Sequence, residues 1–355
     1  MEFPETIFFE GTEETEAAEE LAVKVDALGL KRLLILSSVH GHGLASAFRP
    51  VGVATPPRHA DQSFAATLGS RAKRAGADAL VAIGGGRCID IAKLAAARAG
   101  VTIVAVPTQL SHDGICSPVA VVPNHSGRTE SLGAIPPRFV FLSQATLLKS
   151  PVESVAAGMG DLLANPLALR DWSLAAERGL ADIDQRAWDL SVQSFQLIES
   201  ALDTDAQVLA KDPAFLQRLA DALILSGLAM ICAGTSRPAS GGEHEISHAI
   251  DEVFGGRAMH GAQVAFGCII SAALYGQDTD ALRNRLRRLG LPEHPDDMGL
   301  SEDDVVKVLL AAPDTRPGRF TIVEDADLDE PKARSLVRSI WSDREAAQSG
   351  DGFGR

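Results

Sequence analysis

Residues 79–100 read ALVAIGGGRCIDIAKLAAARAG, and they give the clearest indication of the fold of the N-terminal part of the chain. The apolar run Ala79–Ile83 predicts a buried strand, and apolar positions at helical spacing after it predict a helix that ends at Gly100. A strand that leads through Gly84–Gly86 into a helix brings free backbone N–H groups close to an anion such as a diphosphate, and Arg87 adds positive charge there. The alternative is that the glycines form only a tight turn between strand and helix.

Further apolar runs on both sides of this stretch extend the same pattern. Leu33–Ser37 and Val101–Val106 are predicted strands separated by helical patterns, which is typical of parallel βαβ units with helices on both faces of a sheet. Val119–Val122, a turn-forming Pro-Asn-His-Ser-Gly segment and Phe139–Leu142 predict a hairpin appended to that sheet. The predicted fold class is therefore α/β, with a Rossmann-like nucleotide-binding domain over residues 1–150.

The sequence pattern changes near Ser150. The segment Ser-Pro-Val-Glu that begins there combines a capping serine, a proline at the first helical position and an early glutamate, and it predicts the start of a helix. Beyond it the pattern is almost wholly helical, and Leu216–Cys232 and Val264–Tyr275 are apolar around most of their circumference, as buried helices are. We therefore expect a second, all-helical domain over residues 151–355.

Composition and charge limit the classes of function. The 355 residues carry a formal net charge of −14, and such an acidic surface repels nucleic-acid phosphates and anionic lipids. The four cysteines show no CxxC spacing, which favours a reducing cytoplasm. The N-terminal segment is rich in glutamate, unlike a targeting peptide, and the longest nearly apolar stretch, Ala222–Gly234, is shorter than the roughly 20 residues of a membrane helix. We expect a cytoplasmic protein that binds neither nucleic acid nor membrane.

Three histidines and one aspartate are potential metal ligands. His244-Glu245-Ile-Ser-His248 matches H-E-x-x-H, the zinc-peptidase pattern in which both histidines bind metal and the glutamate activates water, although the longer metzincin extension is absent. His260 follows a double-glycine turn, and a third histidine so close favours a site over a helix with ordinary core histidines. Asp161 lies early in the helical half, and becomes a ligand candidate only if the fold brings it to the histidines.

The loop 107–118, which follows the strand Val101–Val106, is rich in polar side chains. Open α/β sheets place ligands at this end of their strands. Hydroxyl groups of Thr108, Ser111 and Ser117 beside Asp113 suit recognition of a polyol or a cofactor. The same residues also suit a connection stabilised by its own turn hydrogen bonds, and the residues alone leave both interpretations open.

Five segments, taken in order, carry a resemblance to a known family. These segments are AIGGGRCIDIAK (82–93), VPTQLSHDGICSP (106–118), GMGDLLAN (158–165) followed by ALRDWSLA, GGEHEISHAID (241–251) and MHGAQVAFG (259–267). Together they resemble the sn-glycerol-1-phosphate dehydrogenases, which belong to a superfamily of metal-dependent polyol dehydrogenases that also contains glycerol dehydrogenase and dehydroquinate synthase. The resemblance implies a dehydroquinate synthase-like architecture, with an NAD(P)-binding domain, an all-helical metal-binding domain, a cleft between them and assembly into a homo-oligomer.

The resemblance also implies a role for each motif residue. It places the diphosphate of NAD or NADP along Gly84, Gly85, Gly86, Arg87 and Cys88, and lines the rest of the cofactor with Thr108, Gln109, Leu110, Ser111 and Ser117. Asp161, His244 and His260 would bind Zn²⁺ or another divalent metal such as Fe²⁺ or Ni²⁺. Asp113, Asp161 and His248 would contact the substrate and act in catalysis, so that the H-E-x-x-H match is accidental. The implied reaction reduces a small phosphorylated ketone, such as dihydroxyacetone phosphate, to its alcohol.

Some positions depart from the family pattern and leave the substrate open. Ala262 stands where relatives have a glutamate, Gln144 follows a strand where relatives have an aspartate, and Pro166 is expected to interrupt a helix after Asn165. No acidic residue follows the strand that ends at Ser37, so either NAD or NADP fits.

The residue that would hold a substrate phosphate is also open, with Arg128 and Lys149 as the candidates. The alternatives to a dehydrogenase are a dehydroquinate synthase-like sugar-phosphate cyclase, a zinc peptidase and a non-catalytic binding protein. The cyclase family has a glutamate ligand with a lysine three residues later, where this chain has Asp161 and Ala164.

Overall fold

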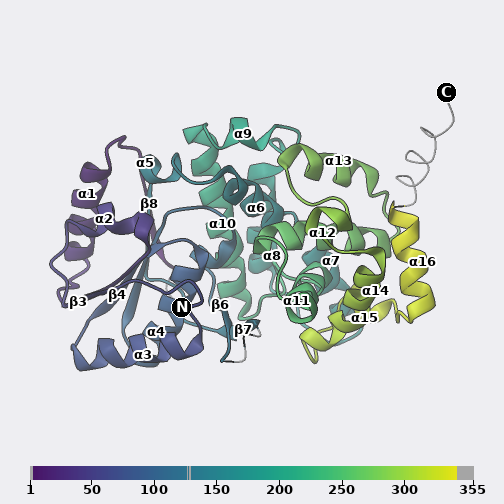
Figure 1. Cartoon of the computed structure of the whole chain (residues 1–355), viewed down its shortest axis with the longest axis horizontal. Coiled ribbons are helices and arrows are strands. Elements are labelled where there is room, and N and C mark those ends of the chain that lie inside the picture. Colours follow the sequence, from purple (N-terminus) through teal and green to yellow (C-terminus); the bar gives the residue numbers. More distant parts are fainter. Residues whose placement is uncertain (1–2, 126, 128, 342–355) are drawn as a thin grey trace.

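The computed structural model describes residues 3–125, 127 and 129–341. The described chain has two parts, a parallel sheet flanked by helices and a larger assembly of helices (Figure 1). These two parts confirm the predicted α/β fold followed by a helical remainder.

Six parallel strands form the main sheet, in the order β1-β8-β5-β4-β2-β3. Their bounds are β1 Glu5–Phe9, β2 Leu33–Ser37, β3 Gly52–Ala54, β4 Ala79–Gly84, β5 Thr102–Pro107 and β8 Phe139–Ser143. The central strands are apolar and buried along almost their whole length, because a parallel sheet is covered by helices on both faces. The predicted strands at 33–37, 79–83 and 101–106 are thereby confirmed to within a residue.

Alternate strand residues face two different layers of helices. Leu34 and Leu36 of β2 face α3 (Gln62–Arg74) and α4 (Gly86–Ala99), whereas Ile35 faces α1 (Glu14–Ala27). This alternation is the period of two expected of a strand. The two short helices α2 (His42–Ala45) and α5 (Gln144–Leu147) complete the layer that contains α1 (Figure 1).

The hairpin differs from its prediction. β6 (Val119–Pro123) pairs antiparallel with β7 (Thr129–Gly133), and the two form a small sheet of their own. The predicted return strand is instead β8, which lies between β1 and β5 in the main sheet. The reason lies in the side chains, since the apolar run FVFLS of β8 is buried along its length, while TESLG of β7 is partly exposed and suits a surface ribbon.

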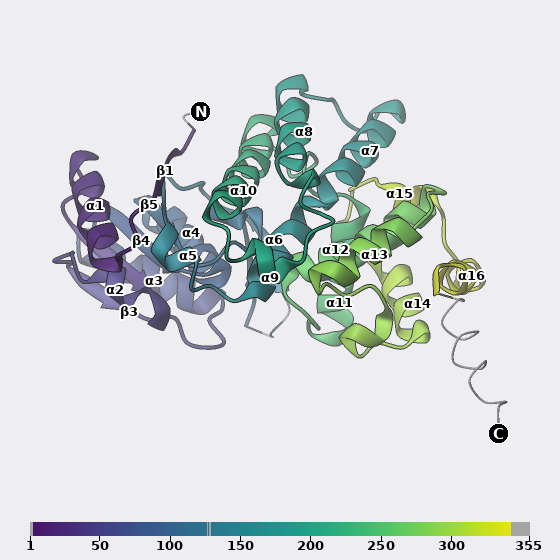
Figure 2. The same ribbon diagram turned by 90° about the horizontal axis from the view of Figure 1, so that it is seen from above.

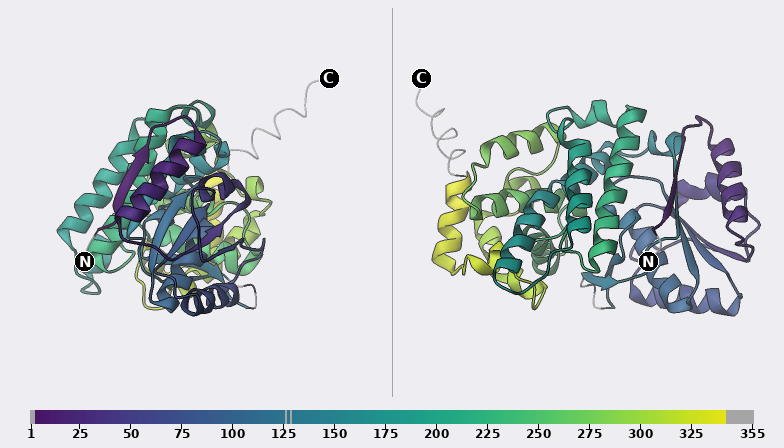
Figure 3. Two further views of the ribbon diagram at one scale, coloured as in Figure 1. Left: turned by 90° about the vertical axis from the view of Figure 1, so that its left-hand side faces the viewer. Right: turned by 180° about the vertical axis from the view of Figure 1, so that it is seen from behind.

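The chain after β8 is helical, as predicted, and packs beside the sheet (Figures 2 and 3). Its longer helices are α6 Val152–Leu162, α7 Ala164–Glu177, α8 Gln185–Glu199, α10 Pro213–Ala233, α11 Gly242–Phe254, α12 His260–Leu274, α13 Asp280–Leu289, α14 Glu302–Ala311 and α16 Glu330–Trp341. Single turns are α9 Ala206–Leu209, α15 Ile322–Asp325 and the 3₁₀ segments η1 Val39–Gly41, η2 Asp113–Ile115, η3 Pro295–Met298 and η4 Ala312–Thr315.

Two local expectations in this part need correction. Helix α6 begins at Val152 with Pro151 as its N-cap, and the hydroxyl of Ser150 donates back to Leu147 O instead of capping the helix. Pro166 does not interrupt a helix, because α7 begins at Ala164 and places the proline in its first turn, where the missing N–H has no intrahelical acceptor to lose.

Helix α10 is longer than its apolar stretch suggested. Its 21 residues, with a mean hydropathy of 1.5 over the best window, are long and apolar enough to cross a membrane by length and composition. However, 67% of that window is buried inside the protein, where α10 packs side by side with α8 (Figure 2). The helix therefore has the surroundings of a core helix.

Candidate active site

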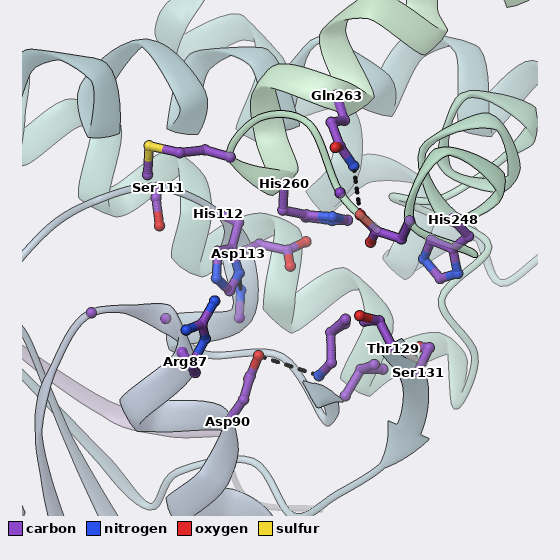
Figure 4. Close-up of a pocket in the computed structure, with 18 of the residues that line it drawn as sticks. Arg87, Asp90, Ser111, His112, Asp113, Thr129, Ser131, His248, His260 and Gln263 are labelled. Carbon is purple, nitrogen blue, oxygen red and sulfur yellow. Dashed lines mark hydrogen bonds between the residues drawn. The ribbon is translucent and has the colours of Figure 1, made fainter. Parts of the chain in front are cut away.

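A cavity of about 1060 Å³ lies between the C-terminal edge of the sheet and the helical part. Its walls come from the turn between β4 and α4, the loop after β5, the β6–β7 hairpin, and α11 with the loop that precedes α12. In Figure 4, Arg87 and Asp90 project from the sheet side, whereas His248 and His260 project from the helical side. The volume is at the upper end of the range of about 300–1,000 Å³ typical of ligand pockets.

Most of the predicted site residues line this one cavity. They are Gly85, Gly86, Arg87, Cys88, Gln109, Ser111, Asp113, Ser117, His244, His248 and His260. Gly84, Thr108 and Leu110 are buried behind them and are not part of the lining, and Thr108 N donates to Gly84 O at 3.0 Å.

Asp161, His244 and His260 form a cluster with the geometry of a metal site. One ligand atom from each lies within 4.8 Å of the others, and Asp161 Oδ1 is 3.8 Å from His244 Nε2 and 3.7 Å from His260 Nε2. Asp161 Oδ1 is buried and has no hydrogen-bond partner among the described residues. An unsatisfied buried carboxylate oxygen facing two imidazole nitrogens is costly unless a cation lies between them, so the three residues fit a divalent metal ion.

The surroundings prepare the two imidazoles for metal binding. His244 Nδ1 lies 3.0 Å from Glu243 Oε1, which fixes the proton on Nδ1 and leaves the Nε2 lone pair toward Asp161. Burial lowers the pKa of both His244 and His260 well below the usual value, and nearby positive groups lower it further. Both rings are therefore neutral near pH 7, as a metal ligand must be.

The polar loop brings Asp113 beside the candidate metal ligands. Asp113 N donates to Asp161 Oδ2 at 2.9 Å, and Asp113 Oδ2 accepts a hydrogen bond from Ser226 Oγ at 2.9 Å. Burial raises the pKa of Asp113 to about 6. Its second carboxylate oxygen remains for a ligand in the cavity.

His248 does not belong to the Asp161–His244–His260 cluster, and this argues against the interpretation of H-E-x-x-H as a zinc-peptidase site. Its ring centroid is 6.5 Å from that of His244, and its Nε2 is 3.3 Å from a nitrogen of Arg316. Glu245 is fully buried, does not line the cavity, and accepts a hydrogen bond from Thr321 Oγ1 at 2.8 Å. It is therefore in no position to activate water at the metal site, and the match to H-E-x-x-H is accidental.

The glycine turn is packed too closely for side chains. A Cβ at Gly85 would lie 2.6 Å from the Gln109 side chain, and one at Gly86 would lie 1.9 Å from His112 Nε2. Helix α4 begins here without a side-chain cap, so the N–H groups of its first turn are not satisfied by a capping side chain. The turn therefore fits the diphosphate of a dinucleotide, with Arg87 beside it.

The side chain of Cys88 contributes no reactive group. Its Sγ faces Leu36 O and Ile83 O at 3.6 and 3.7 Å, and burial raises the pKa of the thiol to about 12. At neutral pH the thiol is protonated and only packs beneath the turn.

Several residues that line the cavity were not predicted from the sequence, among them His112 and Arg316. His112 packs edge-on against His260 with ring centroids 5.8 Å apart, and its Nδ1 accepts a hydrogen bond from Gly114 N at 3.0 Å. Its position directly before Asp113, in the polar loop, could have indicated that His112 belongs to the site. Arg316 has no such signal, because it follows η4, far along the chain from every motif.

Of the two residues considered for a substrate phosphate, the structure describes Lys149 alone, and it lies away from the cavity. Lys149 forms an ion pair with Glu14 at 3.3 Å, its side chain is 68% exposed and it does not line the cavity. Arg128 lies outside the described residues.

Comparison with known proteins agrees with this geometry. Residues 14–151 match the family model for iron-containing alcohol dehydrogenases. Glycerol-1-phosphate dehydrogenase [NAD(P)+] of Cenarchaeum symbiosum is 36% identical over 73% of this chain and 71% of its own length, and that of Methanoculleus marisnigri is 37% identical over 74% and 71%.

A solved structure shares the fold as a whole. A probable glycerol dehydrogenase from Sinorhizobium meliloti superimposes with a TM-score of 0.81 at 22% identity, covering 97% of this chain and 98% of that one. With the curated relatives matched at more than a third identity across more than two thirds of their length, the chain belongs to the glycerol-1-phosphate dehydrogenase family of iron-containing alcohol dehydrogenases.

Proposed function

We propose that this protein is a metal- and NAD(P)-dependent dehydrogenase that interconverts dihydroxyacetone phosphate and sn-glycerol 1-phosphate. The observation that carries the proposal is that His244 and His260 of the Asp161–His244–His260 cluster line the same cavity as Gly85 and Gly86 of the glycine turn. Residues 1–150 then supply the cofactor site and residues 151–355 the metal site. The relatives, which are glycerol-1-phosphate dehydrogenases, support the same reaction.

Each group has a defined part in this reaction. Asp161, His244 and His260 hold the metal and leave coordination positions open, as a catalytic site requires. When bound, the divalent ion supplies Lewis acidity and the nicotinamide supplies hydride. Asp113, held by Ser226, accepts a hydrogen bond from a substrate hydroxyl.

The protonation of His248 follows from its neighbour. Because a guanidinium only donates, the nitrogen of Arg316 donates to His248 Nε2, so the ring carries its proton on Nδ1. Burial first, and then the positive charge of Arg316, lower the pKa of His248 well below the usual value. The neutral ring serves as a donor at Nδ1 to a substrate oxygen in the cavity.

We propose NADP as the preferred cofactor. Ser38 lines the cavity after β2, where an NAD enzyme places an acidic residue, and Arg58 and Arg87 line it as well. A basic cluster suits the 2′-phosphate of NADP. A lower KM for NADPH than for NADH is expected, and equal or reversed constants would contradict this preference.

We also propose which metal ion the protein binds, in which cellular compartment it works and with what it associates. Zn²⁺ suits two imidazoles and one carboxylate, with Fe²⁺ and Ni²⁺ as alternatives. All four cysteines are free, which suits a reducing cytoplasm. We expect a homo-oligomer that acts on a small molecule and binds neither nucleic acid nor membrane.

The test is to supply the metal-loaded protein with dihydroxyacetone phosphate and to follow oxidation of NADPH. We expect turnover, the sn-1 enantiomer of glycerol phosphate as product, and loss of activity in His260→Ala. Turnover of glycerol 3-phosphate instead, or no oxidation with any small phosphorylated ketone, would refute the assignment. Release of inorganic phosphate from a longer sugar phosphate, with formation of a carbocycle and no net change in the cofactor, would support the cyclase alternative.

A further inference from the structure

Arg316 is a cation on the cavity wall beside the metal cluster. Its two terminal nitrogens lie 2.5 Å from Ser240 Oγ and 3.3 Å from His248 Nε2. His248 in turn lies 6.5 and 6.3 Å, between ring centroids, from the metal ligands His244 and His260. Arg316 is therefore within the length of a small substrate from the metal site.

No carboxylate pairs with this guanidinium. Among the residues that the structure describes, no acidic oxygen lies within 4.0 Å of a nitrogen of Arg316. Glu245 and Glu243 lie near enough to act on the charge of Arg316 through space, but neither forms an ion pair with it. One oxygen of each accepts a hydrogen bond from another group, Glu243 Oε1 from Gly241 N and Glu245 Oε2 from Thr321 Oγ1. A partly buried cation without an anionic partner is costly, and a bound anion removes that cost.

The neighbouring arginine fixes the segment that Arg316 contacts. Arg319 donates to the backbone oxygen of Ser240, while Arg316 donates to the hydroxyl of the same residue. Both guanidiniums therefore hold Ser240 at the rim of the cavity, but only Arg316 is part of its lining. Arg319 is thus a positioning residue, and Arg316 is the group available to a ligand.

Other positive features near the metal site are already engaged. The first N–H groups of α11 are satisfied by carboxylates, with Gly241 N on Glu243 and Gly242 N on Asp171. Arg87 lies at the glycine turn, where its Nη1 donates to Arg58 O. Arg257 also lines the cavity, but it is exposed and its guanidinium lies 5.7 Å over the Phe254 ring. Arg316, in contrast, is in direct contact with His248.

We propose that Arg316, together with Ser240, binds the phosphate group of the substrate and so selects phosphorylated over unphosphorylated ketones. The inference rests on the proposed function for the identity of the substrate. Arg presents two parallel N–H donors that match a phosphate, and a charge-assisted bond of this kind strengthens binding of the whole substrate.

The test compares two variants on two substrates. Arg316→Met is expected to raise the KM for dihydroxyacetone phosphate by about 10- to 150-fold and to leave the KM for dihydroxyacetone nearly unchanged. Because Arg316 also donates to His248, we expect a smaller loss of kcat that is the same for both ketones. Arg316→Lys should recover part of the loss, since it restores the charge without the two parallel donors. Arg218→Met, on an exposed arginine of α10, is the matched control and should behave as the original protein.

Binding of inorganic phosphate to the protein without NADPH gives a readout that does not depend on turnover. We expect calorimetric binding to weaken in Arg316→Met and to persist in Arg218→Met, with the metal content of both variants unchanged. Equal losses of kcat/KM on both ketones, or undiminished phosphate binding in Arg316→Met, would overturn the inference. If the original protein does not turn over dihydroxyacetone phosphate, the proposed function fails, while the phosphate titration still decides the role of Arg316.

Discussion

The side-chain amide of Gln263 donates to Asp251 Oδ1 at 2.9 Å, which links α12 to the C-terminal part of α11. Gln263 Oε1 also accepts from the backbone N–H groups of Arg257 and Ala258 at 2.6 and 3.1 Å. One buried side chain thus fixes the loop between the two helices that carry His244 and His260, the proposed histidine ligands (Figure 4). Gln263 lies three residues after His260, so it positions a ligand without touching the metal site.

Replacing Gln263 with leucine removes these bonds while keeping a similar volume. We expect the loop before His260 to loosen and the affinity for metal to fall by about tenfold, as for other groups that orient metal ligands. Zinc affinity measured by competition with a chelating dye checks this. Gln207→Leu, on an exposed turn, is the control. If Gln263→Leu bound zinc as tightly as the control, this positioning role would be wrong.

Removing the metal is expected to abolish activity and to lower stability. A ligand present at about 100 times its Kd stabilises the folded state by about 2.7 kcal/mol, and chelation removes that contribution. Thermal unfolding before and after dialysis against a chelator measures the loss, and adding Zn²⁺ should restore it. In Asp161→Asn, which lacks a ligand and its buried charge, we expect little response to chelation. A response equal to that of the original protein would place the metal elsewhere.

Replacing Gly86 with alanine tests the glycine turn. The new Cβ would lie 1.9 Å from His112 Nε2, so either the ring or the turn must move. Overpacking of this kind costs about 1–3 kcal/mol, and we expect the KM for NADPH to rise by about 5- to 150-fold. Gly133→Ala is the matched control, because no atom lies within 4 Å of its Cβ position. An unchanged KM in Gly86→Ala would mean that the cofactor does not approach this turn.

The sequence predicts those parts of the fold and site that are encoded locally. Continuous apolar runs identified the central strands, and the glycines between β4 and α4 marked the turn at the cavity. The strands with which β8 pairs could not be predicted from the local sequence, because its neighbours β1 and β5 lie far apart in the chain.

The same distinction explains the candidate site. His244 and His248 are adjacent on a helix, yet the structure gives them different neighbours, since Asp161 lies beside one and Arg316 beside the other. Spacing alone cannot separate them, and only the resemblance to a family did so. Arg316 lies 68 residues after His248, and tertiary packing brings the two together.

Lys93 is expected to be essential for stability. Its side chain is fully buried, it pairs with Asp90 Oδ1 at 2.9 Å, and its Nζ donates to the carbonyl oxygens of Gly114 and Ser117 at 2.8 and 3.3 Å. Breaking a buried ion pair by removing one partner costs about 3–5 kcal/mol, so Lys93→Met should lower the free energy of unfolding by that amount. Urea denaturation measures it. The double variant with Asp90→Asn should recover part of the loss, and a strictly additive double variant would rule out coupling between the two charges.

Asp78, which lies away from the candidate metal site, is expected to make the stability of the folded protein depend on pH. Its Oδ2 accepts from the backbone N–H groups of Arg32 and Lys31 at 2.8 and 2.9 Å, and these bonds hold the pKa of Asp78 below its usual value of 3.8. A carboxyl whose pKa is lower in the folded state stabilises the protein above its unfolded pKa, and that contribution disappears as the pH falls through the folded pKa.

Asp78→Asn should therefore unfold at a lower denaturant concentration than the original protein at pH 7, because the neutral amide is a weaker acceptor for the two N–H groups. The difference should shrink as the pH is lowered from about 4 toward 2, where the original carboxyl is itself protonated. The denaturant midpoints of both proteins, measured across this pH range, test whether the difference in stability shrinks as the pH falls. Asp26→Asn, at an exposed carboxyl that accepts from the Lys31 side chain, is the control. A difference that stayed constant down to pH 2 would show that the charge of Asp78 contributes nothing.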